Sequence, residues 1–114
     1  MIAVRAGDDT HHVVNADILK RLGEDGYVIN IARGSVIDQA ALVQALTDKI
    51  IAGAGLDVYA KEPHAPDTLT ALPNVVLTPH TGGHTLESHR NMQDCVLANL
   101  TAFFEGKPLA YPVN

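Results

Sequence analysis

Three short apolar runs, separated by stretches with helical spacing, constrain the fold of this chain more than any other feature. The runs are residues 27–31, 53–58 and 75–78. Apolar runs of this length are typical of strands that are buried on both faces of a parallel sheet. Helices are the usual connections between such strands. The sequence therefore predicts an α/β fold with a parallel sheet and flanking helices.

Capping residues mark where the expected helices begin. Asn15 is a suitable N-cap for a short helix that ends at Gly23 or Gly26, and Asp38 is the expected N-cap of a second helix. Apolar residues at helical spacing predict a third helix between positions 85 and 104. The expected apolar faces contain Ile18, Leu19 and Leu22; then Leu42, Val43 and Leu46; then Met92, Val96, Leu97, Leu100, Phe103 and Phe104.

Composition limits the function classes. The chain has 114 residues with 46% hydrophobic content, which suits one modest core and not two domains. A net charge of −5 with 8 basic residues argues against a nucleic-acid surface. Cys95 has no internal disulfide partner, and neither a signal peptide nor a membrane span is visible. We expect a soluble cytoplasmic protein without nucleic-acid or membrane partners.

The start of the chain leaves an edge of the sheet to explain. Residues 2–4 predict a stub of strand, and residues 63–73 contain three prolines that predict a loop. A sheet of about three or four strands would expose an apolar edge. We therefore expect either part of a larger domain or a protomer that covers this edge by forming a homodimer or another self-association.

Charged residues follow each of the three apolar runs. Arg33 follows the first, Glu62 the second and His80 the third. The carboxyl ends of parallel strands meet at one edge, where open α/β sheets bind ligands. Each residue alone also has a structural explanation: a surface arginine, a solvated loop carboxylate and a structural histidine. Glu62 could also orient the His80 ring as an acid–base pair.

Asp57 lies within the second apolar run, where burial of a carboxylate requires hydrogen-bond donors. It is equally well explained as a satisfied structural group or as a functional one. The six histidines also permit a metal site, with His80, His84 and His89 clustered. His11 and His12 would point to opposite faces of a strand, and no H-E-x-x-H or cysteine cluster supports metal. We expect no metal.

Three spaced motifs resemble the D-isomer-specific 2-hydroxyacid dehydrogenases, in the C-terminal half of their dinucleotide-binding, Rossmann-like domain. The likeness covers nearly the whole chain. It is carried by residues 28–38 (VINIARGSVID), 53–58 (GAGLDV) with Glu62-Pro63, 77–83 (LTPHTGG), and by the tail at 99–104, 106–108 and 112–114.

The resemblance implies an oxidoreductase that transfers hydride between NAD or NADP and a small 2-keto or D-2-hydroxy acid. Arg33 then matches the arginine that binds the substrate carboxylate, His80 the general acid–base, and Glu62 the partner of the imidazolium. Asp57 matches the carboxylate that binds the nicotinamide amide. Segments that line the cofactor match Ile31, Ala32, Arg33 and the His80 loop with Gly82 and Gly83, and Thr10 is placed near the adenosine.

The sequence also departs from the family. The Gly-x-Gly-x-x-Gly phosphate loop and the substrate domain have no counterpart in it, and Arg5 stands where the family often has proline. We therefore interpret residues 1–114 as a single partial, truncated cofactor-binding domain. The alternative is a non-catalytic, self-associating remnant that acts as a structural or binding module. The choice of 2-hydroxy acid and of NAD or NADP stays open.

Overall fold

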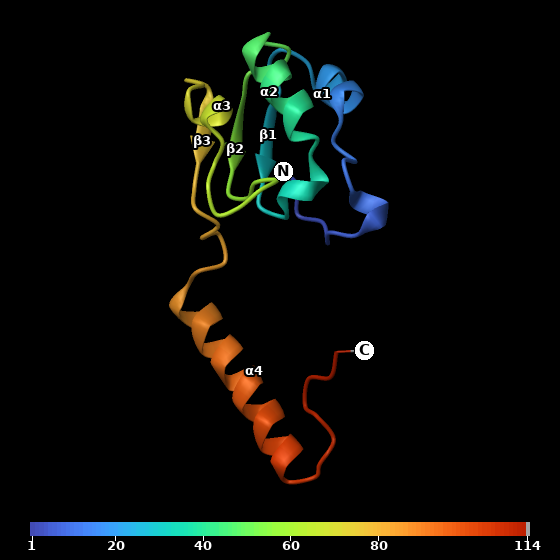
Figure 1. The fold of residues 1–114 in the computed structure, drawn as a ribbon, viewed down its shortest axis with the longest axis vertical. Helices are drawn as coiled ribbons and strands as arrows, with labels where there is room; N and C mark the ends of the chain where they lie inside the picture. The colour runs from blue at the N-terminus through green and yellow to red at the C-terminus, as the bar shows by residue number, and fades with distance from the viewer. Residues whose placement is uncertain (114) are drawn as a thin grey trace. The chain divides into compact units, whose positions relative to one another are not determined.

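The computed structural model describes residues 1–113 and divides into two units, residues 1–82 and residues 83–114 (Figure 1). Asn114, at the end of the tail that resembles the family, lies outside the described residues. The elements of the first unit are η1 (Asp8–Thr10), α1 (Ala16–Leu22), β1 (Tyr27–Asn30), η2 (Gly34–Val36), α2 (Gln39–Thr47), β2 (Gly53–Leu56), α3 (Asp67–Thr70) and β3 (Val75–Leu77). The second unit contains α4 (Leu86–Phe104).

The first unit is built on a parallel three-stranded sheet in the order β1-β2-β3. Tyr27 pairs with Gly53 at the start of β1, and Leu56 pairs with Leu77 at the end of β2. All three strands therefore end at the same edge. The predicted α/β fold with a parallel, Rossmann-like sheet is confirmed, although each strand is one or two residues shorter than expected.

The core lies on one face of this sheet, beneath α1 and α2. Leu19 of α1 and Leu46 of α2 are almost completely buried, and they pack with Val28 of β1 and Leu56 of β2. Alternate residues of the strands face the other way: Tyr27 is 66% and Val76 is 69% exposed. The sheet of the first unit thus packs one face against the core and leaves the other more accessible.

The predicted helix starts agree with the structure. The side chain of Asn15 accepts hydrogen bonds from the backbone N–H groups of Asp17 and Ile18, and Asp38 caps α2 in the same way. Gly23 ends α1 with a positive φ of 80°. These short local signals explain why the sequence pattern located the helices well.

Three local expectations were wrong. The strand expected at residues 2–4 is limited to a single parallel bridge between Ile2 and Asn30. The proline-rich segment contains α3, which buries Leu69 completely, and not only a loop. His11 and His12 lie in a turn, not a strand, and their rings stack with centroids 3.9 Å apart.

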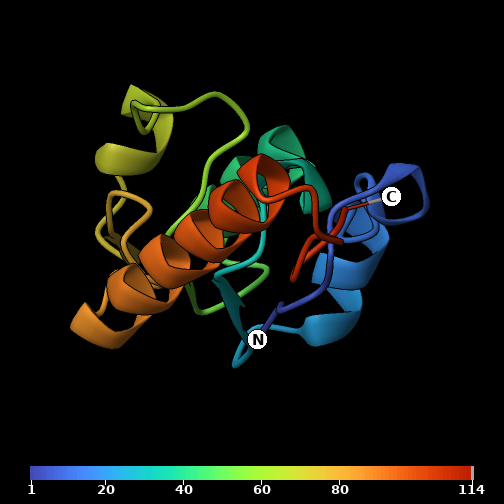
Figure 2. The ribbon, with the colours of Figure 1, turned by 90° about the horizontal axis from the view of Figure 1, so that it is seen from below.

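The second unit consists of α4 and the tail that follows it. Thr85 caps the helix by accepting a hydrogen bond from the backbone N–H of Ser88. Figure 2 shows α4 as one continuous helix. Asn99 exchanges two hydrogen bonds of 2.9 Å with the backbone of Tyr111, which fastens the tail to the helix. None of the residues of α4 is buried.

No helix among residues 1–113 combines the length and apolar character that a membrane crossing requires.

Candidate active site

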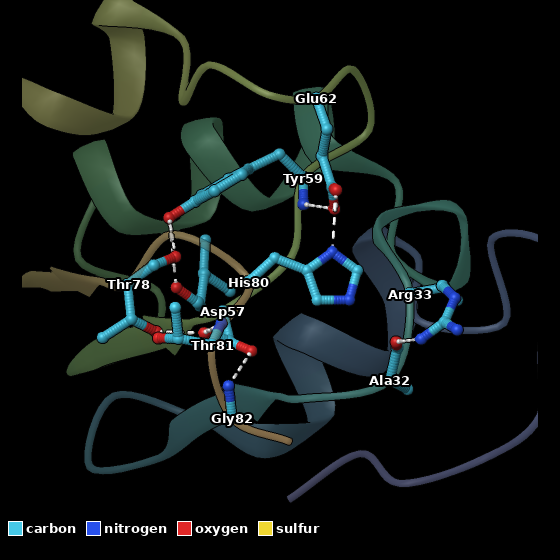
Figure 3. A network of polar contacts seen from close by, with 10 residues as sticks. Ala32, Arg33, Asp57, Tyr59, Glu62, Thr78, His80, Thr81 and Gly82 are labelled. Atoms are coloured by element: carbon cyan, nitrogen blue, oxygen red, sulfur yellow. Dashed lines mark hydrogen bonds and ion pairs between the residues drawn. The ribbon is translucent and has the colours of Figure 1, made fainter. Parts of the chain in front are cut away.

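The carboxyl edge of the sheet carries the candidate site. Arg33 lies in the loop after β1, Glu62 in the loop after β2, and His80 in the loop after β3. Figure 3 shows these side chains together at this edge. Parallel topology explains the arrangement, because strands that run the same way deliver their following loops to the same place.

The loop that carries Arg33 is shaped by a buried asparagine at the end of β1. The Asn30 side chain is 1% exposed; its amide nitrogen donates to the Arg33 carbonyl and its oxygen accepts from the Ala32 N–H, each at 3.0 Å. The Arg33 guanidinium donates to the Ala32 carbonyl at 2.7 Å through Nη1. The side chain of Arg33 itself is exposed, so its remaining donors are available to an anion.

His80 and Glu62 form the central pair of the site. His80 Nδ1 lies 2.8 Å from Glu62 Oε2, and Glu62 Oε1 accepts the Tyr59 N–H at 3.3 Å. The hydrogen bond with His80, together with the hydrogen bond from the Tyr59 N–H and the nearby charges of His80 and Arg33, holds the pKa of the Glu62 carboxyl below its ordinary value. The second ring nitrogen of His80 is on the side toward Arg33 in Figure 3.

The backbone at His80 is unusual. Its φ is 54°, in the left-handed region that residues other than glycine seldom adopt. The turn that follows is held by Asp57, which accepts hydrogen bonds from the Thr78 hydroxyl, the Thr81 N–H (2.9 Å) and the Gly82 N–H (2.8 Å). The His80 loop is therefore fixed from β2 as well as from β3.

Asp57 is 6% exposed. Burial acts to raise the pKa of its carboxyl, but the hydrogen bonds from Thr78, Gly82 and Thr81 outweigh burial and keep the pKa below its ordinary value. Of the two explanations left open by the sequence, the satisfied structural carboxylate is the one whose contacts the structure contains. The role of Asp57 toward a nicotinamide stays a prediction.

A cavity of about 400 Å³ adjoins Arg33. Its lining is Ile31, Ala32 and Arg33 together with residues 3–6, which include Arg5. The cavity thus brings together three of the residues expected at the cofactor and mixes apolar surface with cationic side chains. Apolar lining with a few charged groups is common in sites for small ligands.

The other residues expected at the cofactor do not line this cavity. Thr10 ends η1, and its hydroxyl bonds within its own turn, to the Arg5 and Gly7 carbonyls. Gly82 joins the Asp57 cluster, whereas Gly83 begins the second unit. Their assignments stay predictions. Among residues 1–113, no group of three or more His, Cys, Asp or Glu side chains is placed to hold a metal.

Sequence reasoning missed three residues that organise this edge: Asn30, Tyr59 and Thr78. Asn30 is a polar residue inside an apolar run directly before Arg33, which is a signal that could have been noticed. Tyr59 and Thr78 gave no such signal, because their hydrogen bond of 2.7 Å joins residues 19 positions apart.

Comparisons with known proteins agree with this architecture. Residues 1–82 match the family model of the D-isomer specific 2-hydroxyacid dehydrogenase, NAD binding domain. The chain is 49% identical over 107 residues to glyoxylate/hydroxypyruvate reductase HPR3 of Arabidopsis thaliana, covering 94% of this chain and 33% of that protein. It is 44% identical over 113 residues to 2-ketogluconate reductase of Gluconobacter oxydans, covering 99% of this chain and 36% of the relative.

Solved structures show the same likeness. An NADPH-dependent glyoxylate/hydroxypyruvate reductase from Sinorhizobium meliloti, in complex with NADP and malonate, matches with a TM-score of 0.91 and 44% identity over 97% of this chain and 35% of its own. D-lactate dehydrogenase with NAD⁺ from Lactobacillus jensenii matches with a TM-score of 0.84 and 31% identity over 97% of this chain and 38% of its own. The chain spans about a third of the length of these relatives. By the match over residues 1–82, it belongs to the D-isomer specific 2-hydroxyacid dehydrogenases, in their NAD binding domain.

Proposed function

We propose that Arg33, Glu62 and His80 are the catalytic residues of an NAD(P)H-dependent reductase of small 2-keto acids. The observation that carries the proposal is the 2.8 Å contact between His80 Nδ1 and Glu62 Oε2 at the sheet edge that also bears Arg33. A cation and an oriented imidazole supply the two kinds of group that a reacting 2-keto acid requires. One holds its carboxylate, and the other transfers a proton to its keto oxygen.

Arg33 binds the substrate. A guanidinium presents a planar fork of N–H donors that matches a carboxylate, and it stays charged at any working pH. Because Nη1 is engaged by the Ala32 carbonyl, the guanidinium is anchored while its other donors remain for the anion. Its positive charge also stabilises the negative charge that develops on the substrate oxygen during reduction.

His80 transfers the proton, and Glu62 orients the imidazole ring of His80. With Nδ1 bound to Glu62, the protonated ring donates from Nε2 to the keto oxygen and the imidazolium stays paired with a carboxylate. The lowered pKa of Glu62 keeps that partner ionised at neutral pH. In the oxidation direction, His80 accepts the proton of the hydroxyl.

The cavity of about 400 Å³ beside Arg33 supports a cofactor site formed by these residues. Ile31 and Ala32 would line the nicotinamide, with Asp57, Gly82, Gly83 and Thr10 as the further assigned contacts. When bound, NADH or NADPH supplies the hydride. We infer that residues 1–114 act as one partial cofactor-binding domain. The other contacts to the substrate would then come from segments of the kind that the longer relatives contain.

The decisive experiment tests residues 1–114 within a full-length reductase. Residues 1–114 replace the matching third of the Sinorhizobium meliloti reductase, and oxidation of NADPH and NADH is followed with glyoxylate and hydroxypyruvate. We expect turnover by the chimera and weak or no turnover by the 114-residue chain alone. In the chimera, His80→Gln lowers kcat by about 10²–10⁴-fold, because general acid–base catalysis contributes that much.

His64→Gln is the matched control, since His64 is exposed in the loop after Glu62 and has no part in the proposed chemistry. It should leave kcat unchanged. Equal rates for the unsubstituted chimera and its His80→Gln variant would overturn the assignment of the general acid–base.

A second candidate function, self-association, is favoured by one observation. The accessible face of the sheet carries Tyr27, Ile29 and Val76, which are 66%, 37% and 69% exposed. Apolar side chains gathered on one face are typical of protein contact surfaces. Light scattering that shows a dimer or larger species supports this function, and a monomer at high concentration excludes it.

A further inference from the structure

We propose that Tyr59 is a positioning residue that holds the loops of Arg33, Glu62 and His80 in place relative to one another. The proposal deepens the proposed function, on which it rests, and assigns a role to a residue that touches neither substrate nor cofactor. Tyr59 lies three residues after β2 and is 6% exposed. It contacts each of the three loops through a different part of its structure. Figure 3 shows its hydrogen bonds to Glu62 and to Thr78.

The hydroxyl of Tyr59 reaches the His80 loop. It donates to the Thr78 carbonyl at 2.7 Å and lies 3.3 Å from the Leu56 carbonyl. Thr78 is two residues before His80, and its own side chain donates to Asp57. The hydroxyl therefore fixes the base of the loop whose turn Asp57 fixes from the other end.

The backbone N–H of Tyr59 reaches the partner of His80. It donates to Glu62 Oε1 at 3.3 Å, while Glu62 Oε2 meets His80. One residue thus holds both members of the acid–base pair, the carboxylate through its main chain and the histidine loop through its side chain. The carboxylate is oriented before any substrate arrives, which is the preorganisation that a proton transfer requires.

The peptide carbonyl of Tyr59 packs against the Arg33 loop. A Cβ added at Gly34 would lie 1.9 Å from the Tyr59 oxygen and 2.5 Å from the Ala60 nitrogen. Only glycine permits this approach, so the residue after Arg33 is in contact with the main chain of Tyr59. The Ala60 N–H of the same peptide donates to Gln39 Oε1 at 3.0 Å, which ties it to α2.

The electrostatics of the hydroxyl agree with its role as a donor. Burial raises the pKa of the Tyr59 phenol, and the carboxylates of Asp57 and Glu62 raise it further. The group therefore stays protonated at neutral pH, and its hydrogen bond to the Thr78 carbonyl persists across the working range of the enzyme.

The test is Tyr59→Phe, which removes the hydroxyl and keeps the ring. In the 114-residue chain, the Glu62 carboxyl is titrated by carbon-detected NMR. We expect its pKa to rise toward the ordinary value, because His80 spends less time on the carboxylate once its loop is loosened. Amide exchange at Thr81 and Gly82 should accelerate by about three- to tenfold, the equivalent of one lost hydrogen bond.

Tyr27→Phe is the matched control, because Tyr27 is 66% exposed on the sheet and lies outside the site. It should change neither readout. If Tyr59→Phe lowers the urea midpoint but leaves the Glu62 titration unchanged, Tyr59 serves only the core and the proposal is wrong. These readouts need no turnover, so failure of the proposed reductase activity in the chimera is distinguishable from failure of this proposal.

Discussion

The two units of the chain differ in what maintains their structure. Residues 1–82 have a core in which Leu19, Leu42 and Leu69 are at most 1% exposed, and buried polar side chains that are hydrogen-bonded. Residues 83–114 have a long helix without a buried residue, in which Phe104 is 81% exposed. Helices of this kind gain most of their stability from packing of an apolar face. The first unit is therefore stabilised by its own core, whereas the second depends on the cap at Thr85 and on the hydrogen bonds between Asn99 and Tyr111.

The largest expected effect distinguishes the two units directly. Leu46→Ala removes a side chain that is 2% exposed between α2 and the sheet, and it should lower the free energy of unfolding by about 2–5 kcal/mol. Leu100→Ala in α4 removes the same atoms from a side chain that is 49% exposed, and it should cost less than about 0.5 kcal/mol. Urea unfolding followed by circular dichroism measures both. An equal cost at the two positions would show that α4 is packed as tightly as the core of the first unit.

A medium effect concerns the buried carboxylate of the first unit. Because the pKa of Asp57 is lower in the folded state, its contribution to stability is present above its ordinary pKa and is lost as pH falls through the folded value. The urea midpoint of residues 1–82 should therefore fall below about pH 4. Asp57→Asn should flatten this dependence and cost about 1–3 kcal/mol at pH 7, since a buried amide replaces an acceptor of three hydrogen bonds.

Asp25→Asn, at an exposed turn position, is the control and should leave both the midpoint and its pH dependence unchanged. A variant of Asp57 that keeps the full acid sensitivity of the parent would show that other carboxyl groups account for it.

The smallest expected effect concerns the N-terminal cap of α4 in the second unit. Thr85→Ala removes the side-chain acceptor for the Ser88 N–H, and loss of such a cap costs about 1 kcal/mol of helix stability. Amide exchange in the first turn of α4 should accelerate by about fivefold, whereas Thr85→Ser should retain protection. If neither substitution changes exchange there, contacts other than the cap hold this end of the helix.

Local signals explain how far the fold could be predicted. Asn15, Asp38 and Thr85 cap the three helices that the sequence predicted, because each cap acts on backbone groups within three residues. The segment at 63–73 was different. Its prolines predicted a loop, yet Pro66 precedes α3 and Leu69 anchors that short helix in the core. A four-residue helix is too short to give a periodic pattern in the sequence, and the burial of Leu69 depends on tertiary contacts that the sequence does not reveal.

The site could be predicted in part for a related reason. The order of strand ends placed Arg33, Glu62 and His80 at one edge, since parallel topology follows from strand and helix alternation. The contact between His80 and Glu62 then appeared as expected. The partners of Asp57 could not be predicted, because its bond to Gly82 joins residues 25 positions apart and depends on the conformation of the His80 turn.

The left-handed backbone at His80 limits which residues can replace histidine at this position. At a φ of 54°, glycine has no steric penalty and asparagine a small one, whereas β-branched residues are strongly disfavoured. On the proposed role of His80 in proton transfer, loss of selection for that role should allow glycine or asparagine at this position while the fold persists. Histidine is itself among the residues that occur more often than most at positive φ, so the backbone at position 80 and the proposed proton transfer both accommodate this side chain.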